Sequence, residues 1–181
     1  MINIAILYHS EKGRTKIVAE EIGKGAMVGG AEVHLISVIA EIDWDLLHRC
    51  DALVFGSPTY MGSVSAPFKK FMDDSGNVWM KHVWKDKIAA GFTNSHSYSG
   101  DKLNVLVQMA IFAAQHGMIW VGSGDMPTGS TPDDLNRLGS FMGVMTQSDT
   151  AIAIDPPPLG DRKTAFNYGM RIAEMAKKLL G

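Results

Sequence analysis

The chain has 181 residues, of which 46% are hydrophobic and 20% are charged, so it is long and apolar enough for one domain with a sizeable core. Its 17 basic and 19 acidic residues give a formal net charge of -2, which excludes a general attraction to nucleic acid or to an anionic membrane. A single cysteine, Cys50, excludes an intramolecular disulfide and favours a cytoplasmic setting.

The first half of the chain alternates between strand and helix patterns. An apolar run typical of a buried strand comes first, followed by apolar residues at helical spacing. In chain order we predict strand Ile2–Tyr8, helix 15–27 ended by Gly29-Gly30, strand 32–38, helix Trp44–Arg49, strand 52–55 and a helix beginning at Pro67. The start of the chain lacks the basic region of a signal peptide, and no apolar run approaches the roughly 20 residues of a membrane span.

The second half keeps this alternation up to residue 121 and then loses it. We predict a strand over 88–92, a helix over 101–115, a strand over 118–121 and a last helix over 162–180. Between Gly122 and Leu159 the pattern weakens, with one helical pattern over 132–142; a long irregular segment of this kind is usually functional. Five strands separated by helices predict an α/β fold with a doubly wound five-stranded parallel sheet, in three layers α/β/α.

A turn with the composition of an anion site follows the first strand and reads Ser10-Glu11-Lys12-Gly13-Arg14-Thr15. In doubly wound sheets, ligands bind beyond the carboxyl ends of the strands, where the strand order reverses. Backbone N–H groups at a helix start, together with two hydroxyls, can hold a phosphate, and Gly13 lets the backbone approach it. The turn fits equally well a solvated connection capped by Ser10 or Thr15. It is neither a Walker A motif nor a dinucleotide fingerprint.

Two further loops, rich in small polar residues and glycine, follow the third and fourth strands. They read Gly56-Ser57-Pro58-Thr59-Tyr60-Met61-Gly62-Ser63-Val64 and Thr93-Asn94-Ser95-His96-Ser97-Tyr98-Ser99-Gly100. Since the first, third and fourth strands should be neighbours in the sheet, both loops should lie next to the loop Ser10 to Thr15. A flavin ring needs a flat slot with backbone donors and aromatic or apolar cover, which these loops can supply. In isolation each also fits an ordinary surface turn.

Taken together, these residues resemble the flavodoxin-like WrbA family of FMN-dependent NAD(P)H:quinone oxidoreductases. The similarity runs from Met1 to about Val121 and includes the three loops and the step His116-Gly117-Met118 before the fifth strand. Trp79 corresponds to a tryptophan that walls the site in the family. The chain departs from the family at Tyr60, where the family has arginine, and at Met61, where it has an aromatic residue.

The resemblance implies one flavodoxin-like domain over residues 1–181 that binds FMN, with the cofactor held by Ser10 to Thr15, Pro58 to Gly62 and Thr93 to Gly100. It implies NAD(P)H as co-substrate, a quinone or similar small molecule as acceptor by ping-pong hydride transfer, and a homodimer or homotetramer. The catalytic candidates are His96, His116 and Trp79. An FMN-carrying electron-transfer protein without its own NAD(P)H activity stays open as the alternative. The remaining histidines lack metal-ligand spacing, so we predict no metal site.

Overall fold

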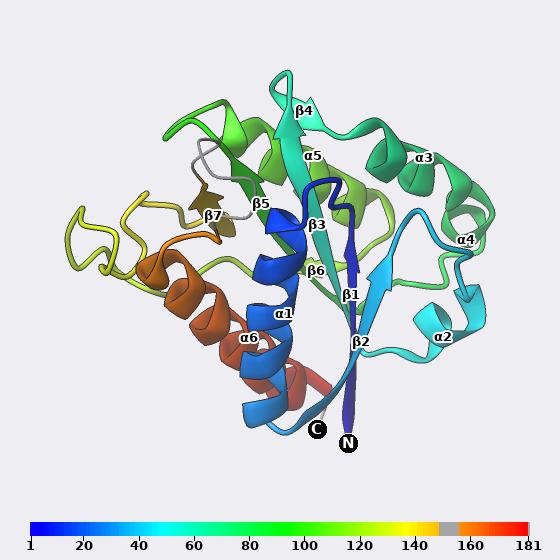
Figure 1. Cartoon of the computed structure of the whole chain (residues 1–181). Coiled ribbons are helices and arrows are strands. Elements are labelled where there is room, and N and C mark those ends of the chain that lie inside the picture. Colours follow the sequence, from blue (N-terminus) through cyan, green and yellow to red (C-terminus); the bar gives the residue numbers. More distant parts are fainter. Residues whose placement is uncertain (149–155, 181) are drawn as a thin grey trace.

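The protein is described by a computed structural model over residues 1–148 and 156–180, and a twisted sheet between layers of helices forms its core (Figure 1). The strands are Ile2–Tyr8 (β1), Ala31–Ser37 (β2), Ala52–Tyr60 (β3), Ser63–Val64 (β4), Ile88–Ser95 (β5), Ile119–Trp120 (β6) and Val144–Gln147 (β7). The helices are Arg14–Val28 (α1), Trp44–Arg49 (α2), Ala66–Asp74 (α3), Gly76–Met80 (α4), Lys102–Gln115 (α5) and Leu159–Leu180 (α6). None of these helices has the length and apolar character needed to cross a bilayer.

The sheet has the strand order β2-β1-β3-β5-β6, and these strands are parallel. The chain therefore winds from β1 outward to β2 in one direction and from β1 through β3 to β5 in the other. This order is that of flavodoxin-like sheets, and its switch point lies between β1 and β3. The predicted doubly wound parallel sheet is confirmed.

Two short strands share the fifth position of the sheet. Strand β6 pairs with the start of β5, where Ile119 lies opposite Ile88, and β7 pairs with its end, where Val144 lies opposite Phe92. The segment between β6 and β7 forms turns and bends, so the helix predicted over 132–142 is wrong. The carboxylate of Asp134 accepts hydrogen bonds from the backbone and hydroxyl of Thr131, and such local side-chain bonds compete with a helix.

Strands β3 and β5 extend into stretches that were predicted as loops, and Pro58 pairs with Asn94 across the sheet. Glycine, proline and small polar residues are depleted in strands, which is why the pattern indicated loops there. In the folded chain, the Thr93 hydroxyl donates to the Ser57 carbonyl at 2.7 Å and helps to join the two strand ends. Part of the predicted loop residues is therefore held rigidly in the sheet.

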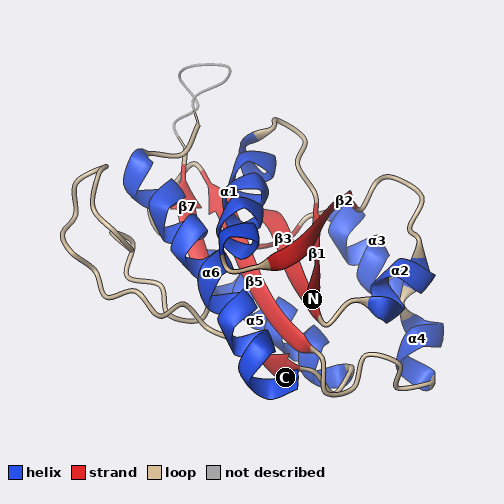
Figure 2. Ribbon diagram, turned by 90° about the horizontal axis from the view of Figure 1, so that it is seen from below, coloured by secondary structure: helices blue, strands red, loops and turns tan. Residues whose placement is uncertain are grey.

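The core lies on both faces of the sheet, as expected for parallel strands that are buried on both sides (Figure 2). Ile4 and Ile6 of β1 pack toward α1 and α6, and Ala5 and Leu7 toward the helices of the other face. Helices α1 and α6 lie side by side so closely that a side chain on Gly169 would overlap the backbone of α1. This packing holds the second half of α1 against α6.

Candidate functional site

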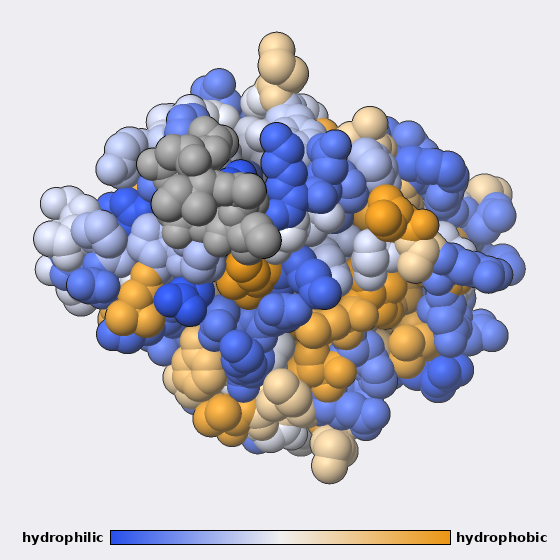
Figure 3. All heavy atoms as spheres, in the orientation of Figure 1, coloured by the Kyte–Doolittle hydropathy of each residue, from blue (hydrophilic) through white to orange (hydrophobic). Residues whose placement is uncertain are grey.

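A cavity of about 230 Å³ lies at the switch point, beyond the carboxyl ends of β1, β3 and β5. Around this edge the surface of the face drawn in Figure 3 is largely hydrophilic. The lining comes from all three predicted loops and consists of Ser10, Glu11, Lys12, Arg14, Thr15, Pro58, Thr59, Tyr60, Asn94, Ser95 and His96. The tertiary structure thus brings together segments as far apart in the chain as Ser10 and His96.

The start of α1 has the features of an anion site. The turn reaches the helix through Gly13, whose φ of 80° lies in the left-handed region that favours glycine. The Ser10 hydroxyl accepts a hydrogen bond from the Lys16 backbone N–H at 3.1 Å and so caps the first turn from outside. That turn carries no acidic residue, so within the helix itself nothing offsets the positive end of its dipole.

Glu11 and Tyr60 join the first and second loops. The Tyr60 hydroxyl donates to a Glu11 carboxylate oxygen at 3.1 Å. Burial, and secondly the hydrogen bond to Glu11, raise the pKa of Tyr60, so its hydroxyl keeps its proton over the physiological range. A carboxylate repels a phosphate, so the Glu11 side chain serves to tie the loops rather than to bind an anion.

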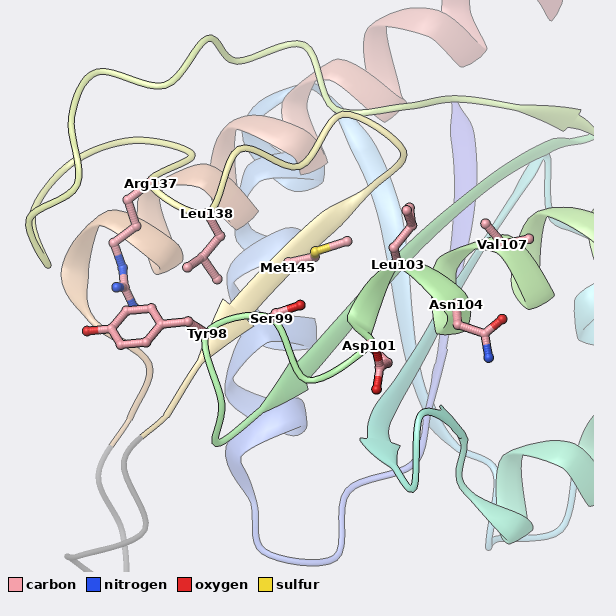
Figure 4. Close-up of a pocket in the computed structure, with 9 residues that line it drawn as sticks. All are labelled: Tyr98, Ser99, Asp101, Leu103, Asn104, Val107, Arg137, Leu138 and Met145. Atoms are coloured by element: carbon pink, nitrogen blue, oxygen red, sulfur yellow. The ribbon is translucent and has the colours of Figure 1, made fainter.

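Several members of the predicted loops lie outside this cavity. Met61 forms the tip of the β3–β4 hairpin with a fully exposed side chain, and it adopts a φ of 50° that non-glycine residues rarely take. Tyr98 is turned away and lies over the Arg137 guanidinium, with 5.7 Å between Cζ and the ring centroid (Figure 4). Thr93 is fully buried between β3 and β5. These residues border the site without lining it, as do Gly13, Gly62, Ser97, Ser99 and Gly100.

A larger cavity, of about 760 Å³, lies on the other side of the loop over residues 95–100 (Figure 4). It is lined by Tyr98, Ser99, Asp101, Leu103, Asn104, Val107, Arg137, Leu138 and Met145. Its arginine is already paired with Asp161 at 2.8 Å, and Asp101 adds a carboxylate to its rim. The smaller cavity at the start of α1 is therefore better suited to an anionic ligand.

A buried polar network, which the sequence did not reveal, holds the 95–100 loop from behind. Arg137 and Asp161 form a two-bond ion pair, with side chains 3% and 2% exposed. Asp161 also accepts the backbone N–H of Gln147 at 2.8 Å, and the Gln147 carboxamide donates to the His96 carbonyl at 2.8 Å. No spacing rule links these residues, because they come from four separate segments of the chain.

Lys102 is the second part of this network. It is 1% exposed, and its ammonium donates to the Ser95 hydroxyl at 2.9 Å and to the Ser97 carbonyl at 2.5 Å. One sequence signal could have pointed to it, since it is the only charged residue in an otherwise uncharged helix over Lys102–Gln115. A charge at the buried start of such a helix indicates a specific role.

Of the three catalytic candidates, only His96 lines the cavity. His116 follows α5 at the amino end of β5, where its ring lies 4.5 Å from that of Trp84 and its Nε2 is 3.0 Å from the Ser75 hydroxyl. Because β5 has eight residues with a rise of ~3.3 Å each, its two ends are roughly 23 Å apart. Trp79 lies in α4 and does not line the cavity. Within one chain, the fold separates both residues from the cavity.

His116 should make the stability of the protein depend on pH. Burial, and secondly the neighbouring His82, lower the pKa of His116 from 6.5 to about 4. The unfolded chain therefore binds more protons between these values, and the stability present above pH 6.5 is lost as the pH falls toward 4. We expect His116 to account for a loss of about 2 kcal/mol in unfolding free energy between pH 6.5 and 5.

Urea unfolding at both pH values checks this expectation. His116→Gln should lose about 2 kcal/mol less than the wild type over this range. Equal losses in the wild type and in His116→Gln would show that His116 is not the group responsible.

Comparisons with known proteins cover the whole chain. A family model described as NADPH-dependent FMN reductase matches residues 44–133. The chain is 39% identical over 182 residues to Flavodoxin FldP of Pseudomonas aeruginosa, covering 99% of both chains. It is 31% identical over 203 residues to NAD(P)H dehydrogenase (quinone) of Archaeoglobus fulgidus, covering 99% of this chain and 100% of that one. A crystal structure described as a flavodoxin, WrbA-like protein from Agrobacterium tumefaciens has a TM-score of 0.79 at 37% identity, covering 99% of both chains.

Proposed function

The chain belongs to the flavodoxin-like WrbA family, and on that premise we propose that it is an FMN-dependent NAD(P)H:quinone oxidoreductase. The flavin site is the cavity at the carboxyl ends of β1, β3 and β5. One observation carries the proposal: three loops that are separate in the sequence line one cavity at the topological switch point, where α1 begins.

The start of α1 holds the FMN phosphate in this proposal. Backbone N–H groups at a helix N-terminus and the left-handed turn at Gly13 suit a phosphate. The basic side chains of Lys12 and Arg14 line the same end of the cavity and add positive charge. Glu11 opposes them, but its carboxylate already accepts the Tyr60 hydroxyl.

In this proposal only part of FMN lies inside the cavity, and the rest is exposed. Its volume of about 230 Å³ is below the roughly 300–1,000 Å³ of most small-molecule sites, so it suits the phosphate and the sugar chain. The ring then lies toward the exposed edge, between the end of β3 and the start of the 95–100 loop. Thr59 and Tyr60 wall one side of this edge, and Ser95 and His96 wall the other.

Bound FMN would supply the hydride-transfer chemistry, with NAD(P)H as donor and a quinone as acceptor. The residues of the chain position the flavin and its substrates and shield them from water. The open edge gives both substrates access to the same place in turn, as a ping-pong order requires. Because NAD(P)H docks only transiently at this edge, the chain needs no dinucleotide fingerprint. His96, at the rim, is placed to donate a hydrogen bond to a substrate oxygen.

The second candidate function is that of an FMN-carrying electron-transfer protein without NAD(P)H activity of its own. The relative with 39% identity is itself called a flavodoxin, which favours this reading, whereas the relative with 31% identity is called an NAD(P)H dehydrogenase (quinone). Small electron carriers often use strong acidity to reach basic partners. The net charge of -2 therefore favours the enzyme.

The proposal also covers the form in which the chain works. It is one flavodoxin-like domain over residues 1–181, located in the cytoplasm and assembled as a homodimer or homotetramer. Trp79 is 45% exposed in α4 and lies far from the cavity of its own chain. It can wall a flavin site only in a neighbouring copy, so an assembly would restore the role that the resemblance implies for it.

An anaerobic titration tests the proposed function. The purified protein is supplied with FMN, its visible spectrum is recorded, and NADPH and then benzoquinone are added. We expect bound-flavin absorption that NADPH bleaches and the quinone restores. A protein that binds no FMN contradicts the whole proposal. Bound flavin that neither NADPH nor NADH reduces contradicts the enzyme and favours the electron carrier.

A further inference from the structure

The 95–100 loop has a cavity on each side and buried cations behind it. Ser95 and His96 line the smaller cavity, and Tyr98 lines the larger one (Figure 4). Behind the loop, Lys102 contacts Ser95 and Arg137 underlies Tyr98. The loop therefore separates the flavin site proposed above from the buried cations Lys102 and Arg137.

The ammonium of Lys102 is buried and forms no ion pair with residues 1–148 or 156–180. Its acceptors are the Ser95 hydroxyl and the Ser97 carbonyl, both uncharged. In the part of the chain that the structure describes, no carboxylate lies within 4.0 Å of it, and the nearby Asp161 is already bound to Arg137. A buried cation with only neutral partners costs stability, so Lys102 is not explained by its contribution to folding.

The charges around Lys102 do not cancel its own. Among the described residues, the charged groups that act on it are Asp161 and Arg137, which neutralise one another as a buried pair. Burial is the main cause that lowers the pKa of Lys102, to about 8, so the ammonium form still prevails at pH 7. The buried network therefore carries a net charge of about +1 at neutral pH.

This charge is separated from the smaller cavity by one residue. Ser95 lines the cavity, and its hydroxyl accepts a hydrogen bond from the Lys102 ammonium. In the low-dielectric interior a unit charge acts over several ångströms without contact. Two-electron reduction adds negative charge to a flavin ring. A fixed positive charge behind the ring's wall therefore stabilises the reduced flavin more than the oxidised one.

We propose that Lys102 is a positioning and electrostatic residue of the flavin site: it holds the 95–100 loop through Ser95 and Ser97, and its buried charge favours reduced over oxidised flavin. This inference rests on the proposed function. It predicts that the residue changes the redox preference of the site, which a merely structural lysine would not do.

Four variants test the inference. Lys102→Met removes the charge and the donor, Lys102→Gln removes the charge but keeps a donor, and Lys102→Arg keeps both. Lys163→Met removes the same charge from an exposed position of α6 and serves as the control. The measurements are the urea unfolding midpoint, the dissociation constant of oxidised FMN, and the midpoint potential of bound FMN.

We expect Lys102→Met and Lys102→Gln to lower the preference for reduced over oxidised FMN at least tenfold, which for a two-electron couple is a potential about 30 mV more negative. Lys102→Arg should stay within about twofold of the wild type, and Lys163→Met should be unchanged. If Lys102→Met does not fold, Lys102→Gln decides.

An unchanged midpoint potential in Lys102→Gln with FMN bound overturns the inference. It would mean that the substitution changes the affinities for reduced and oxidised FMN equally, which would make Lys102 a structural support of the loop alone. A wild-type chain that binds no FMN contradicts the proposed function itself, and the role of Lys102 falls with it. Bound FMN with an unshifted potential contradicts the role of Lys102 alone.

Discussion

Replacement of Asp161 by leucine is expected to lower the free energy of unfolding by about 3–5 kcal/mol. The side chain is 2% exposed, and it binds Arg137 through both oxygens and the Gln147 backbone N–H. The variant leaves the Arg137 guanidinium buried without its counter-charge. Urea unfolding followed by circular dichroism, at pH 7 and moderate salt, measures the loss.

A double-mutant cycle separates the pair from its surroundings. Arg137→Met should cost a similar amount, because Asp161 is then the unpaired buried charge, but the double variant Arg137→Met/Asp161→Leu should cost much less than the sum. Asp74→Leu is the control, since its ion pair with Lys70 is exposed and should contribute less than about 1 kcal/mol. Strictly additive losses would contradict the coupling.

Asp161→Leu should also weaken flavin binding. The ion pair of Asp161 with Arg137 is connected to the proposed site through Gln147, which contacts both Asp161 and His96. With Asp161 replaced, the Gln147 backbone N–H loses its acceptor, and the Arg137 guanidinium that also donates to the Gln147 side-chain oxygen at 3.1 Å loses its counter-charge. We expect this to weaken the hydrogen bond from Gln147 to the His96 carbonyl, which is one of the contacts that hold the 95–100 loop. A buried ion pair between the segment that follows β6 and α6 is thus linked to the loop after β5 that we propose as part of the flavin site.

Ser10→Asp is expected to lower the affinity for FMN by at least about 100-fold, or about 2.8 kcal/mol, while leaving the protein as stable as the wild type. The aspartate keeps an oxygen acceptor for the Lys16 N–H, and a carboxylate near a helix start is favourable. The FMN phosphate, however, would be repelled by the introduced carboxylate at its proposed binding site. Quenching of flavin fluorescence during titration measures the affinity.

Riboflavin and a neutral variant are the controls for this prediction. Riboflavin lacks the phosphate, so Ser10→Asp should bind it as the wild type does. Ser10→Ala adds no charge and removes one capping hydrogen bond, so it should cost about 1 kcal/mol of stability and change FMN affinity far less. An equal loss of riboflavin and FMN affinity would place the phosphate elsewhere.

Most of the scaffold was predictable from the sequence because its signals are local. The strand Ile2–Tyr8 and the short helix Trp44–Arg49 were predicted with the bounds that the structure has. Hydrophobic periodicity indicates such elements directly, and alternation of strand and helix leaves a parallel sheet as the compact solution. Glycine and proline were less reliable guides, since the residues from Gly56 to Pro58 lie within β3 rather than in a loop.

The sequence by itself thus determined the doubly wound sheet and the three loops that meet at its switch point, because both follow from periodicity and from the geometry of parallel strands. Only the tertiary structure decided that β7 completes the fifth strand position, that His116 and Trp79 lie away from the cavity, and that Lys102, Arg137 and Asp161 lie behind the 95–100 loop. These are contacts between residues far apart in the chain, and their energies depend on burial and on the charge of distant partners, which no local pattern encodes.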